Sequence, residues 1–479
     1  MRRSGYRVVT VFYKDFNSIH PQPASETELG LIGDIVAKEK PFMVGFSVMS
    51  SMYLETVDKV IAAIRTRTNA FTICGGAYAT MFPERFLDMG VNFVIRTDGE
   101  ISLCRLADAL TKDSDWHHIP SLCYKEDGKN IINEIGNILT EIDDYGLPAI
   151  DCENAYFIEN DRVQAGDPQL GAMSYEVIVS RGCPFTCSYC CCVNLRRLFP
   201  QGTEYVRTRS AESVIDELMI AKKKFKKLVF IHFYDEIFPN SPGWIDKFAV
   251  EYQKHINLPF TIWSHPKVIN GDELKKLVSV GLVEVIMGIQ SGSERVRRDV
   301  FHRYETQEDI INATRVIRES GVYWATYDFM LQHPFETISD LTETYFLVKK
   351  LFPPFELQLH GLNFLPGTDI VGMAIDQGKL TARQMDAIMY APMQEQFSAY
   401  WKQENELMSQ LWYRMIYCLQ FPGPRKEIEG YENDPVAHQK EINACYERCR
   451  KMFKHRYYRK KIHVILRRMG LTWRHFLWK

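Results

Sequence analysis

The stretch Ser180-Arg-Gly-Cys-Pro-Phe-Thr-Cys-Ser-Tyr-Cys190 carries three cysteines in the pattern Cys-x3-Cys-x2-Cys. Three thiolates at this spacing suit a cubane iron–sulfur cluster, which usually takes four ligands. One iron then has no protein ligand, and an open coordination site is where a metal centre can do chemistry. A zinc site usually draws its ligands from two Cys or His pairs, and no second pair completes this one. We therefore interpret Cys183, Cys187 and Cys190 as the ligands of a 4Fe–4S cluster.

The residues around these cysteines resemble a known family. An apolar run, 177–179, enters the loop, Arg181-Gly182 precedes the first cysteine, and Tyr189 stands directly before the third. This context resembles the radical S-adenosylmethionine (SAM) superfamily. The resemblance implies that SAM chelates the open iron and that an electron from the cluster splits SAM to a 5′-deoxyadenosyl radical. Cys191 and Cys192 continue the run, and we interpret them as buried or spare thiols because the family spacing ends one residue earlier.

The composition is that of a soluble globular protein with two or three domains. The chain has 479 residues, of which 46% are hydrophobic and 25% are charged. Most of its twelve cysteines lie in apolar contexts. Together with a labile cluster, these cysteines predict a reducing, cytoplasmic location. The N-terminus lacks the apolar region of a signal peptide, and no run of about 18 apolar residues predicts a membrane span.

The net charge of −2 conceals an uneven distribution. Residues 451–479 carry ten Lys and Arg and no Asp or Glu, which leaves the preceding residues at −12. The same basic tail holds six aromatic residues, Phe453, Tyr457, Tyr458, Trp473, Phe476 and Trp478. Such a segment can lie on an anionic membrane surface or follow a nucleic-acid backbone, and the alternative is a solvated helix that packs its aromatic side chains on the barrel. We favour a small or lipid-linked substrate over nucleic acid, because no recognisable RNA-binding module accompanies the tail.

Residues 1–115 alternate between short apolar runs and helical stretches. The runs are Arg7–Tyr13, Phe42–Ser47, Phe71–Cys74 and Asn92–Ile95, which suit buried parallel strands. The alternation predicts a doubly wound, Rossmann- or flavodoxin-like α/β domain, in which ligands bind at the carboxyl ends of the strands.

The predicted strand ends are small and polar. Their candidate ligand-binding residues are Ser47, Ser50, Ser51, Gly75, Gly76, Gly99 and Glu100. They resemble the cobalamin-binding domain that precedes many radical SAM cores, and the resemblance implies a pocket for the corrin. Glycine lets the backbone approach a flat ligand, and hydroxyl groups can donate to its amides. Compared with that family, we expect the first strand–helix unit to be missing. No Asp-x-His-x-x-Gly loop offers a histidine to the cobalt.

Residues 116–171 are predicted to be a linker that contains a small hairpin closed by the Asp127-Gly128 turn. From 172 to 375 the alternation of strands and helices resumes, and six strands predict a partial (β/α)6 barrel of the TIM type. Residues 376–479 are mainly helical by pattern. In that region Cys445 and Cys449 could ligate a second cluster, but a packed core pair is the favoured interpretation.

The strand ends of the predicted barrel carry the candidate SAM residues. Asp235 and Glu236 follow an apolar strand, and carboxylates at that end of a barrel strand are more often functional than structural. The resemblance implies that this acidic pair holds the SAM ammonium group. Further along stand Gly288, Gln290, Ser291, Gly292 and Arg303. The glycines would admit adenosine, Gln290 would bind the ribose hydroxyls, and Arg303 would pair with the SAM carboxylate. The family usually has Glu where this chain has Gln290.

The sequence thus predicts an enzyme. With cobalamin, the resemblance implies class B methyl transfer to an unactivated carbon or phosphorus, or a related C–C bond formation or ring closure. Without cobalamin, it implies a rearrangement, oxidation or coupling driven by the adenosyl radical. Either activity needs a reductant such as flavodoxin or ferredoxin. A cluster-containing binding or electron-transfer protein is the remaining alternative, and the Gly288–Gly292 turn argues against it because an electron carrier needs no SAM pocket.

Overall fold

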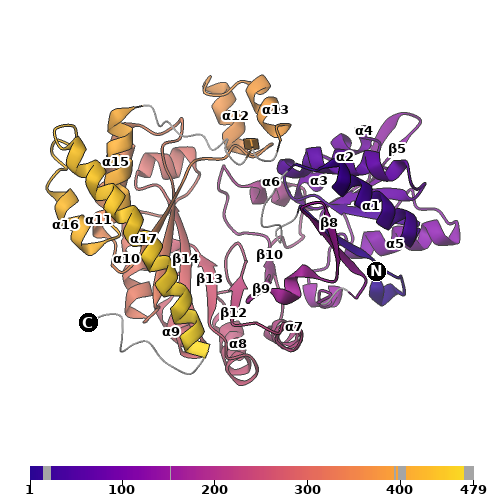
Figure 1. Cartoon of the computed structure of the whole chain (residues 1–479), viewed down its shortest axis with the longest axis horizontal. Helices are drawn as coiled ribbons and strands as arrows, with labels where there is room; N and C mark the ends of the chain where they lie inside the picture. Colours follow the sequence, from indigo (N-terminus) through magenta and orange to yellow (C-terminus); the bar gives the residue numbers. More distant parts are fainter. Residues whose placement is uncertain (15–22, 151–152, 393–394, 397–405, 469–479) are drawn as a thin grey trace. The chain divides into compact units, whose positions relative to one another are not determined.

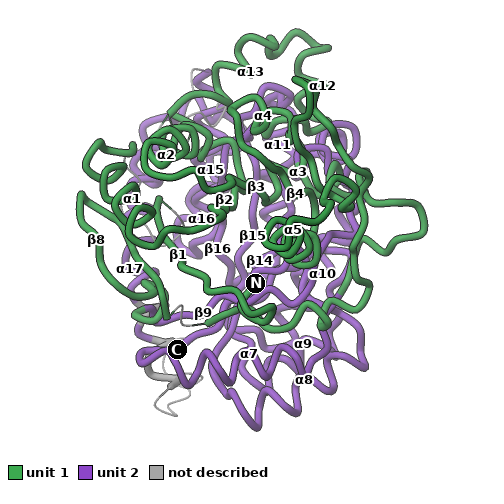
Figure 2. Tube along the Cα trace, turned by 90° about the vertical axis from the view of Figure 1, so that its right-hand side faces the viewer, with its two compact units in different colours: residues 1–171, 190–207, 364–399 green, residues 172–189, 208–363, 400–479 purple. Residues whose placement is uncertain are grey.

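The computed structural model describes residues 1–14, 23–150, 153–392, 395–396 and 406–468. The chain divides into two compact units, each built from three segments (Figure 2). The first unit comprises residues 1–171, 190–207 and 364–399. The second unit comprises residues 172–189, 208–363 and 400–479. The two units therefore interleave along the sequence, and the linear domain boundaries at 115, 171 and 375 stay a prediction.

A five-stranded sheet forms the core of the first unit, with the strand order β2-β3-β4-β5-β6. Its strands are β2 (Met43–Ser47), β3 (Phe71–Gly75), β4 (Phe93–Ile95), β5 (Leu122–Glu126) and β6 (Lys129–Ile132). The first three run parallel, and β5 and β6 are the antiparallel hairpin predicted around the Asp-Gly turn. The helices of the unit are α1 (Glu26–Glu39), α2 (Leu54–Arg65), α3 (Ala77–Met81), α4 (Pro83–Asp88), α5 (Glu100–Lys112), α6 (Cys191–Arg197), α12 (Asp369–Asp376) and α13 (Ala382–Met389) (Figure 1).

Alternation along the strands explains why this sheet is covered on both faces. Cys74 and Val94 face a core that includes Ile61 of α2 and Phe86 of α4. Their chain neighbours, Ile73 and Phe93 among them, face a second core that contains Leu106 of α5. Successive side chains of a strand point to opposite faces of the sheet. A strand whose residues are all apolar must therefore be covered on both faces. The doubly wound arrangement is confirmed.

One predicted strand lies in a different sheet. β1 (Thr10–Tyr13) pairs in parallel with β7 (Ala155–Glu159), and β7 forms an antiparallel hairpin with β8 (Arg162–Ala165). The residues of β1 are only partly buried, and Tyr13 packs with Ile158 against α1. Because the run is covered on one side only, it does not need a place inside the five-stranded sheet. The expectation that Arg7–Tyr13 belongs to that sheet was wrong.

A six-stranded, all-parallel sheet forms the core of the second unit, in the order β16-β15-β14-β13-β12-β9. Its strands are β9 (Ser174–Val177), β12 (Phe230–Phe233), β13 (Phe260–Ser264), β14 (Leu282–Gln290), β15 (Trp324–Met330) and β16 (Glu356–His360). The helices between them are α7 (Ala211–Lys224), α8 (Pro242–His255), α9 (Gly271–Val280), α10 (Gln307–Glu319) and α11 (Ile338–Lys350) (Figure 1). The partial (β/α)6 barrel is confirmed. Ser210 and Thr306 are the N-caps of α7 and α10.

Three further helices complete the second unit. They are α15 (Leu407–Cys418), α16 (Pro422–Glu429) and α17 (Gln439–Arg468). Helix α15 packs against both α11 and α17, which ties this helical region to the barrel. Within the described part of the chain, no helix is both long enough and apolar enough to cross a membrane.

Candidate active site

The cluster loop follows β9 and the short strand β10 (Ser180–Arg181). Gly182 has a φ of +89°, a conformation that glycine adopts without the cost that a side chain would add. Cys183 is half-buried and Cys187 is buried, and both belong to the second unit. Between them and the third cysteine, Ser188 is held by its backbone amide, which donates to the Phe301 carbonyl at 3.1 Å. The loop is therefore anchored inside the barrel unit at its buried cysteine.

Cys190 begins the segment that belongs to the first unit and precedes helix α6. Its sulfur and those of Cys191 and Cys192 all lie within 4.8 Å of one another. Cys191 is the first residue of the helix, and Cys192 is buried. The structure thus brings both neighbouring thiols close to the third predicted ligand, and the assignment of Cys190 itself stays a prediction.

Arg303 is the centre of a buried polar network next to Cys187. Its Nε donates to Glu305 Oε1 at 2.6 Å, and its Nη2 donates to the Gly288 carbonyl at 2.7 Å. Its Nη1 donates to the Tyr189 hydroxyl at 3.2 Å and lies 3.9 Å from Cys187 Sγ. One guanidinium therefore joins the cluster loop to the end of β14. Direct pairing with a SAM carboxylate stays a prediction.

Glu305 balances the charge of Arg303. Its side chain is fully buried, and its Oε2 lies 3.5 Å from Nε2 of His265. Burial alone would raise the pKa of Glu305, but the close approach of His265 and the charge of Arg303 outweigh burial and lower this pKa to about 2. The imidazole of His265 stacks on Phe185 of the cluster loop, with ring centroids 3.7 Å apart, and burial lowers its pKa. Glu305 is therefore an anion that holds both side chains.

The sequence analysis did not identify Glu305 or His265 as site residues. The available signal was Arg303 itself, because a buried guanidinium needs a carboxylate and Glu305 is two residues away. Phe185 was also missed, because no sequence pattern marks an aromatic residue within such a cysteine loop as part of a site.

The end of β14 and the turn that follows it, residues 288–292, have two separate roles. Gln290 has a φ of +71°, and its Nε2 lies 2.6 Å from where a Cβ on Gly288 would stand. These two residues are half-buried beside Arg303. Ser291 is fully buried, and the Gly292 amide donates to Thr344 Oγ1 of α11 at 2.9 Å. The first part of the turn can therefore meet a ligand, whereas the second part packs the strand end onto the helix.

We expect Gly292→Ala to destabilise the protein much more than Gly288→Ala. A Cβ on Gly292 would lie 2.2 Å from the Cα of Thr344, which is backbone and cannot move alone. A Cβ on Gly288 would clash with the flexible end of Gln290 and would make an ordinary contact with Arg303 Nη1 at 3.9 Å. Overpacking of this kind costs about 1–3 kcal/mol, and the lack of room at Gly292 places it at the upper end. Thermal unfolding of the two variants checks this, and equal melting temperatures would contradict it.

Asp235 supports the chain where it enters the cluster loop. Its Oδ1 accepts hydrogen bonds from the amides of Val179 and Ser180, at 2.9 and 2.6 Å, and from the Ser180 hydroxyl at 2.7 Å. The side chain is nearly fully buried, and burial outweighs these bonds and raises its pKa to about 6. Its Oδ2 has no hydrogen-bond partner among the described residues. Glu236, the other member of the acidic pair, is exposed.

The predicted cobalamin residues stand at the carboxyl ends of β2, β3 and β4, which are neighbours in one sheet. Ser50 caps the turn that follows β2, and Ser51 donates to Gln396 at 3.1 Å. Gly76 has a φ of +98°, and a Cβ there would lie 2.7 Å from the Val48 carbonyl oxygen. These three residues serve the fold itself. The others remain partly or fully accessible at the strand ends, namely Ser47, Gly75, Gly99 and Glu100.

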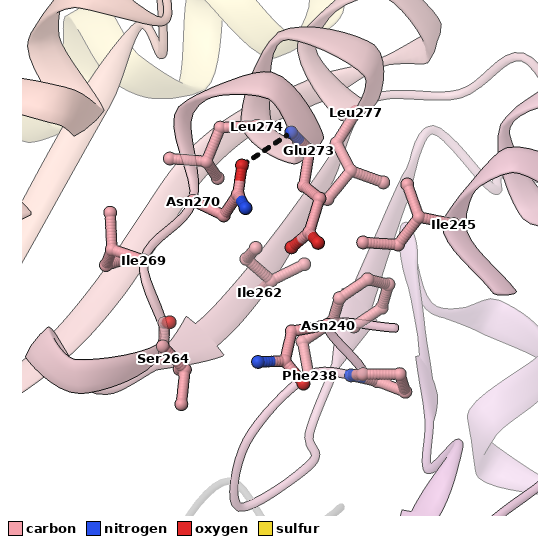
Figure 3. A pocket seen from close by; sticks show the side chains of 12 residues that line it. Phe238, Asn240, Ile245, Ile262, Ser264, Ile269, Asn270, Glu273, Leu274 and Leu277 are labelled. Atoms are coloured by element: carbon pink, nitrogen blue, oxygen red, sulfur yellow. Dashed lines mark hydrogen bonds between the residues drawn. The ribbon is translucent and has the colours of Figure 1, made fainter. Parts of the chain in front are cut away.

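The second unit contains a small pocket (Figure 3). It is enclosed by β13, α8 and α9, and most of its lining is apolar. Asn270 caps α9 at its edge, and the carboxylate of Glu273 points into it. Burial raises the pKa of Glu273. None of the predicted cluster or SAM residues lines this pocket, so it is a gap in the helix–strand packing and not the candidate active site.

Comparison with known proteins supports the assignment of the barrel unit. The radical SAM superfamily matches residues 177–348. An uncharacterised methyltransferase of Pyrococcus horikoshii is 27% identical over 323 residues, which are 67% of this chain and 66% of that protein. An anaerobic magnesium-protoporphyrin IX monomethyl ester cyclase of Cereibacter sphaeroides is 24% identical over 59% of this chain and 45% of its own length. The chain thus spans about half to two thirds of these curated relatives.

Two solved structures share the fold. The radical SAM methyltransferase TsrM from Kitasatospora setae, with tryptophan and a SAM analogue bound, aligns with a TM-score of 0.58 at 17% identity, covering 78% of this chain and 76% of that one. The cobalamin-dependent radical SAM enzyme OxsB, with aquacobalamin and SAM bound, aligns with a TM-score of 0.61 at 13% identity, covering 93% and 75%. At these identities the likeness is one of fold. The match assigns residues 177–348 as a radical SAM domain.

Proposed function

We propose that this chain is a cobalamin-dependent radical SAM methyltransferase that acts on an unactivated carbon or phosphorus. The observation that carries the proposal is the presence, in one chain, of a Cys-x3-Cys-x2-Cys barrel unit and an α/β unit with glycine- and serine-rich strand ends. The fold shared with TsrM and OxsB and the methyltransferase relative support it. Ring closure is the second candidate, because another relative is a cyclase.

The residues present fit the groups that this chemistry needs. Three cysteines in one loop supply thiolates for a cluster with one open iron. Asp235 Oδ2 is buried and unpartnered among the described residues, which suits an incoming ammonium donor. When bound, the cluster and SAM would supply a radical for hydrogen abstraction, and cobalamin would supply a methyl group.

The protein's own contribution is to hold and orient these groups. Arg303 fixes Tyr189 and the Gly288 carbonyl in one arrangement. Glu305 holds Arg303, and His265 lies against Glu305. Burial of this network limits water near Cys187 and strengthens its electrostatic interactions. We assign the SAM site to Tyr189, Asp235, Glu236, Gly288, Gln290, Ser291, Gly292 and Arg303. Ser291 and Gly292 act there through the shape of the turn.

The substrate class that we favour is a small or lipid-linked molecule. Tyr457 and Tyr458 on the basic part of α17 are exposed, which suits contact with a membrane surface. Arg456 differs from its neighbours, because it stacks on Phe421 and donates to the Gln420 carbonyl at 2.9 Å. Trp473, Phe476 and Trp478 of the tail lie outside the described residues.

Retention of cobalamin tests the proposal. We expect the purified protein, mixed with hydroxocobalamin and desalted, to keep about one corrin per chain, and Gly75→Val to abolish this. A Cβ on Gly75 meets nothing closer than 3.7 Å, so the variant should fold, yet its side chain would occupy the strand end. Gly45→Val is the matched control, because Gly45 also lies in a parallel strand and has no atom within 4 Å of its Cβ position.

Two outcomes would count against cobalamin. A wild-type protein that retains no corrin would favour the cobalamin-independent radical reaction. Equal retention by Gly75→Val and the control would move the corrin away from these strand ends. Gly76 cannot serve in this test, because a side chain there would clash with the backbone of Val48 whether or not cobalamin binds.

A further inference from the structure

Three cysteines converge between two helices of the second unit, far along the sequence from the cluster loop. Cys418 is the last residue of α15, and Cys445 and Cys449 lie one turn apart on α17. All three side chains are fully buried, with 0% exposure. Their sulfur atoms all lie within 4.8 Å of one another, where α15 packs against α17 (Figure 1). The pair seen in the sequence is therefore part of a three-thiol group.

The spacing of these sulfurs indicates one ion and not a cubane cluster. A tetrahedral zinc ion with bonds of about 2.3 Å to sulfur sets its ligand sulfurs about 3.8 Å apart. A cubane cluster places each thiolate on a different iron, which holds the sulfurs farther apart than a single ion does. The three sulfur atoms lie no more than 4.8 Å apart, so they would have to move only slightly closer together to bind a single ion.

One cationic side chain lies next to the two cysteines of α17. Arg448 stands between them in the helix. Arg448 also forms an ion pair with Glu427 of α16, which holds its guanidinium in place. A divalent ion bound by three thiolates has a net charge of −1, and the guanidinium of Arg448 offsets this charge only in part, because it is shared with Glu427.

We propose that Cys418, Cys445 and Cys449 bind one thiophilic cation, Zn²⁺ or Cu⁺, which fastens α15 to α17. Thiolates select these soft ions over Mg²⁺ and Ca²⁺. Among the described residues no His, Asp or Glu joins the three sulfurs within 4.8 Å. Zn²⁺ would complete its coordination with a small exogenous ligand, whereas three thiolates alone satisfy Cu⁺. The metal binds with release of the thiol protons, and no oxidation or reduction is involved.

Metal analysis of the full chain, reconstituted anaerobically with its iron–sulfur cluster and then loaded with Zn²⁺ or Cu⁺, tests the site. We expect one added ion per chain after desalting and a rise in melting temperature. Cys445→Ser with Cys449→Ser should weaken binding by at least about 100-fold. Cys123→Ser is the matched control, because Cys123 is a buried thiol of the first unit. Retention of Zn²⁺ alone or of Cu⁺ alone identifies the ion and supports the site.

Cobalt substitution keeps the test decisive if the double variant does not fold. Wild-type protein loaded with Co²⁺ should show strong sulfur-to-cobalt charge transfer in the near ultraviolet, and added Zn²⁺ should remove it. Absence of any stoichiometric ion would overturn the proposal, and so would a cobalt spectrum without charge transfer in a protein that retains Zn²⁺. Iron and sulfide at twice the amount of one cluster, lost in the double variant, would also overturn it by showing a second cluster.

Discussion

Simultaneous replacement of Cys183, Cys187 and Cys190 by alanine should abolish the iron–sulfur cluster. Iron and acid-labile sulfide should fall from about four of each per chain to background, because removal of all three thiolates leaves the loop with no protein ligand for the cubane. Cleavage of SAM to 5′-deoxyadenosine and methionine should disappear with the cluster. Iron and sulfide analysis after anaerobic reconstitution measures the first effect, and chromatography of the products measures the second.

The neighbouring thiols provide the control for this experiment. Single replacement of Cys191 or Cys192 should leave most of the cluster in place, although both sulfurs lie within 4.8 Å of that of Cys190. Undiminished cluster content in the triple variant would refute the assignment. Loss of the cluster in Cys191→Ala, with retention in Cys190→Ala, would move the third ligand by one residue.

The barrel could be predicted because its strands are short apolar runs that end in polar residues. The sequence Phe260-Thr-Ile-Trp263, for example, is such a run, and β13 extends it by one residue. Such a run is buried on both faces in a parallel sheet, so its hydrophobicity alone marks it. Arg7–Tyr13 has the same appearance, yet β1 is half-exposed and pairs with β7, which no sequence signal had marked. Local pattern predicted the strand but not its partner.

The two cysteine sites also differ in whether local sequence could predict them. Cys183, Cys187 and Cys190 are close in sequence, so their spacing carries the prediction. Cys418 joins Cys445 and Cys449 only because α15 packs on α17, and no spacing rule links residues on two separate helices. Contacts between distant segments have to be read from the fold.

Arg303 makes the clearest case for separating ligand binding from stability. Arg303→Ala should lower the affinity for SAM by about 1.5–3 kcal/mol if the guanidinium pairs with the SAM carboxylate, the usual value for a charged hydrogen bond. It should also destabilise the fold by about 3–5 kcal/mol, because Glu305 would remain buried after losing a charged partner. Anaerobic SAM titration and thermal unfolding of the same samples measure the two effects.

The double variant Arg303→Ala with Glu305→Ala separates these effects. Removing both charges leaves no buried carboxylate to compensate, so much of the lost stability should return. Affinity for SAM should not return, because the double variant still lacks the guanidinium that would pair with the SAM carboxylate and that contacts Tyr189 and Gly288. Recovery of affinity together with stability would show that Arg303 acts only by neutralising Glu305. Equal affinity of wild type and Arg303→Ala would remove Arg303 from the SAM site altogether.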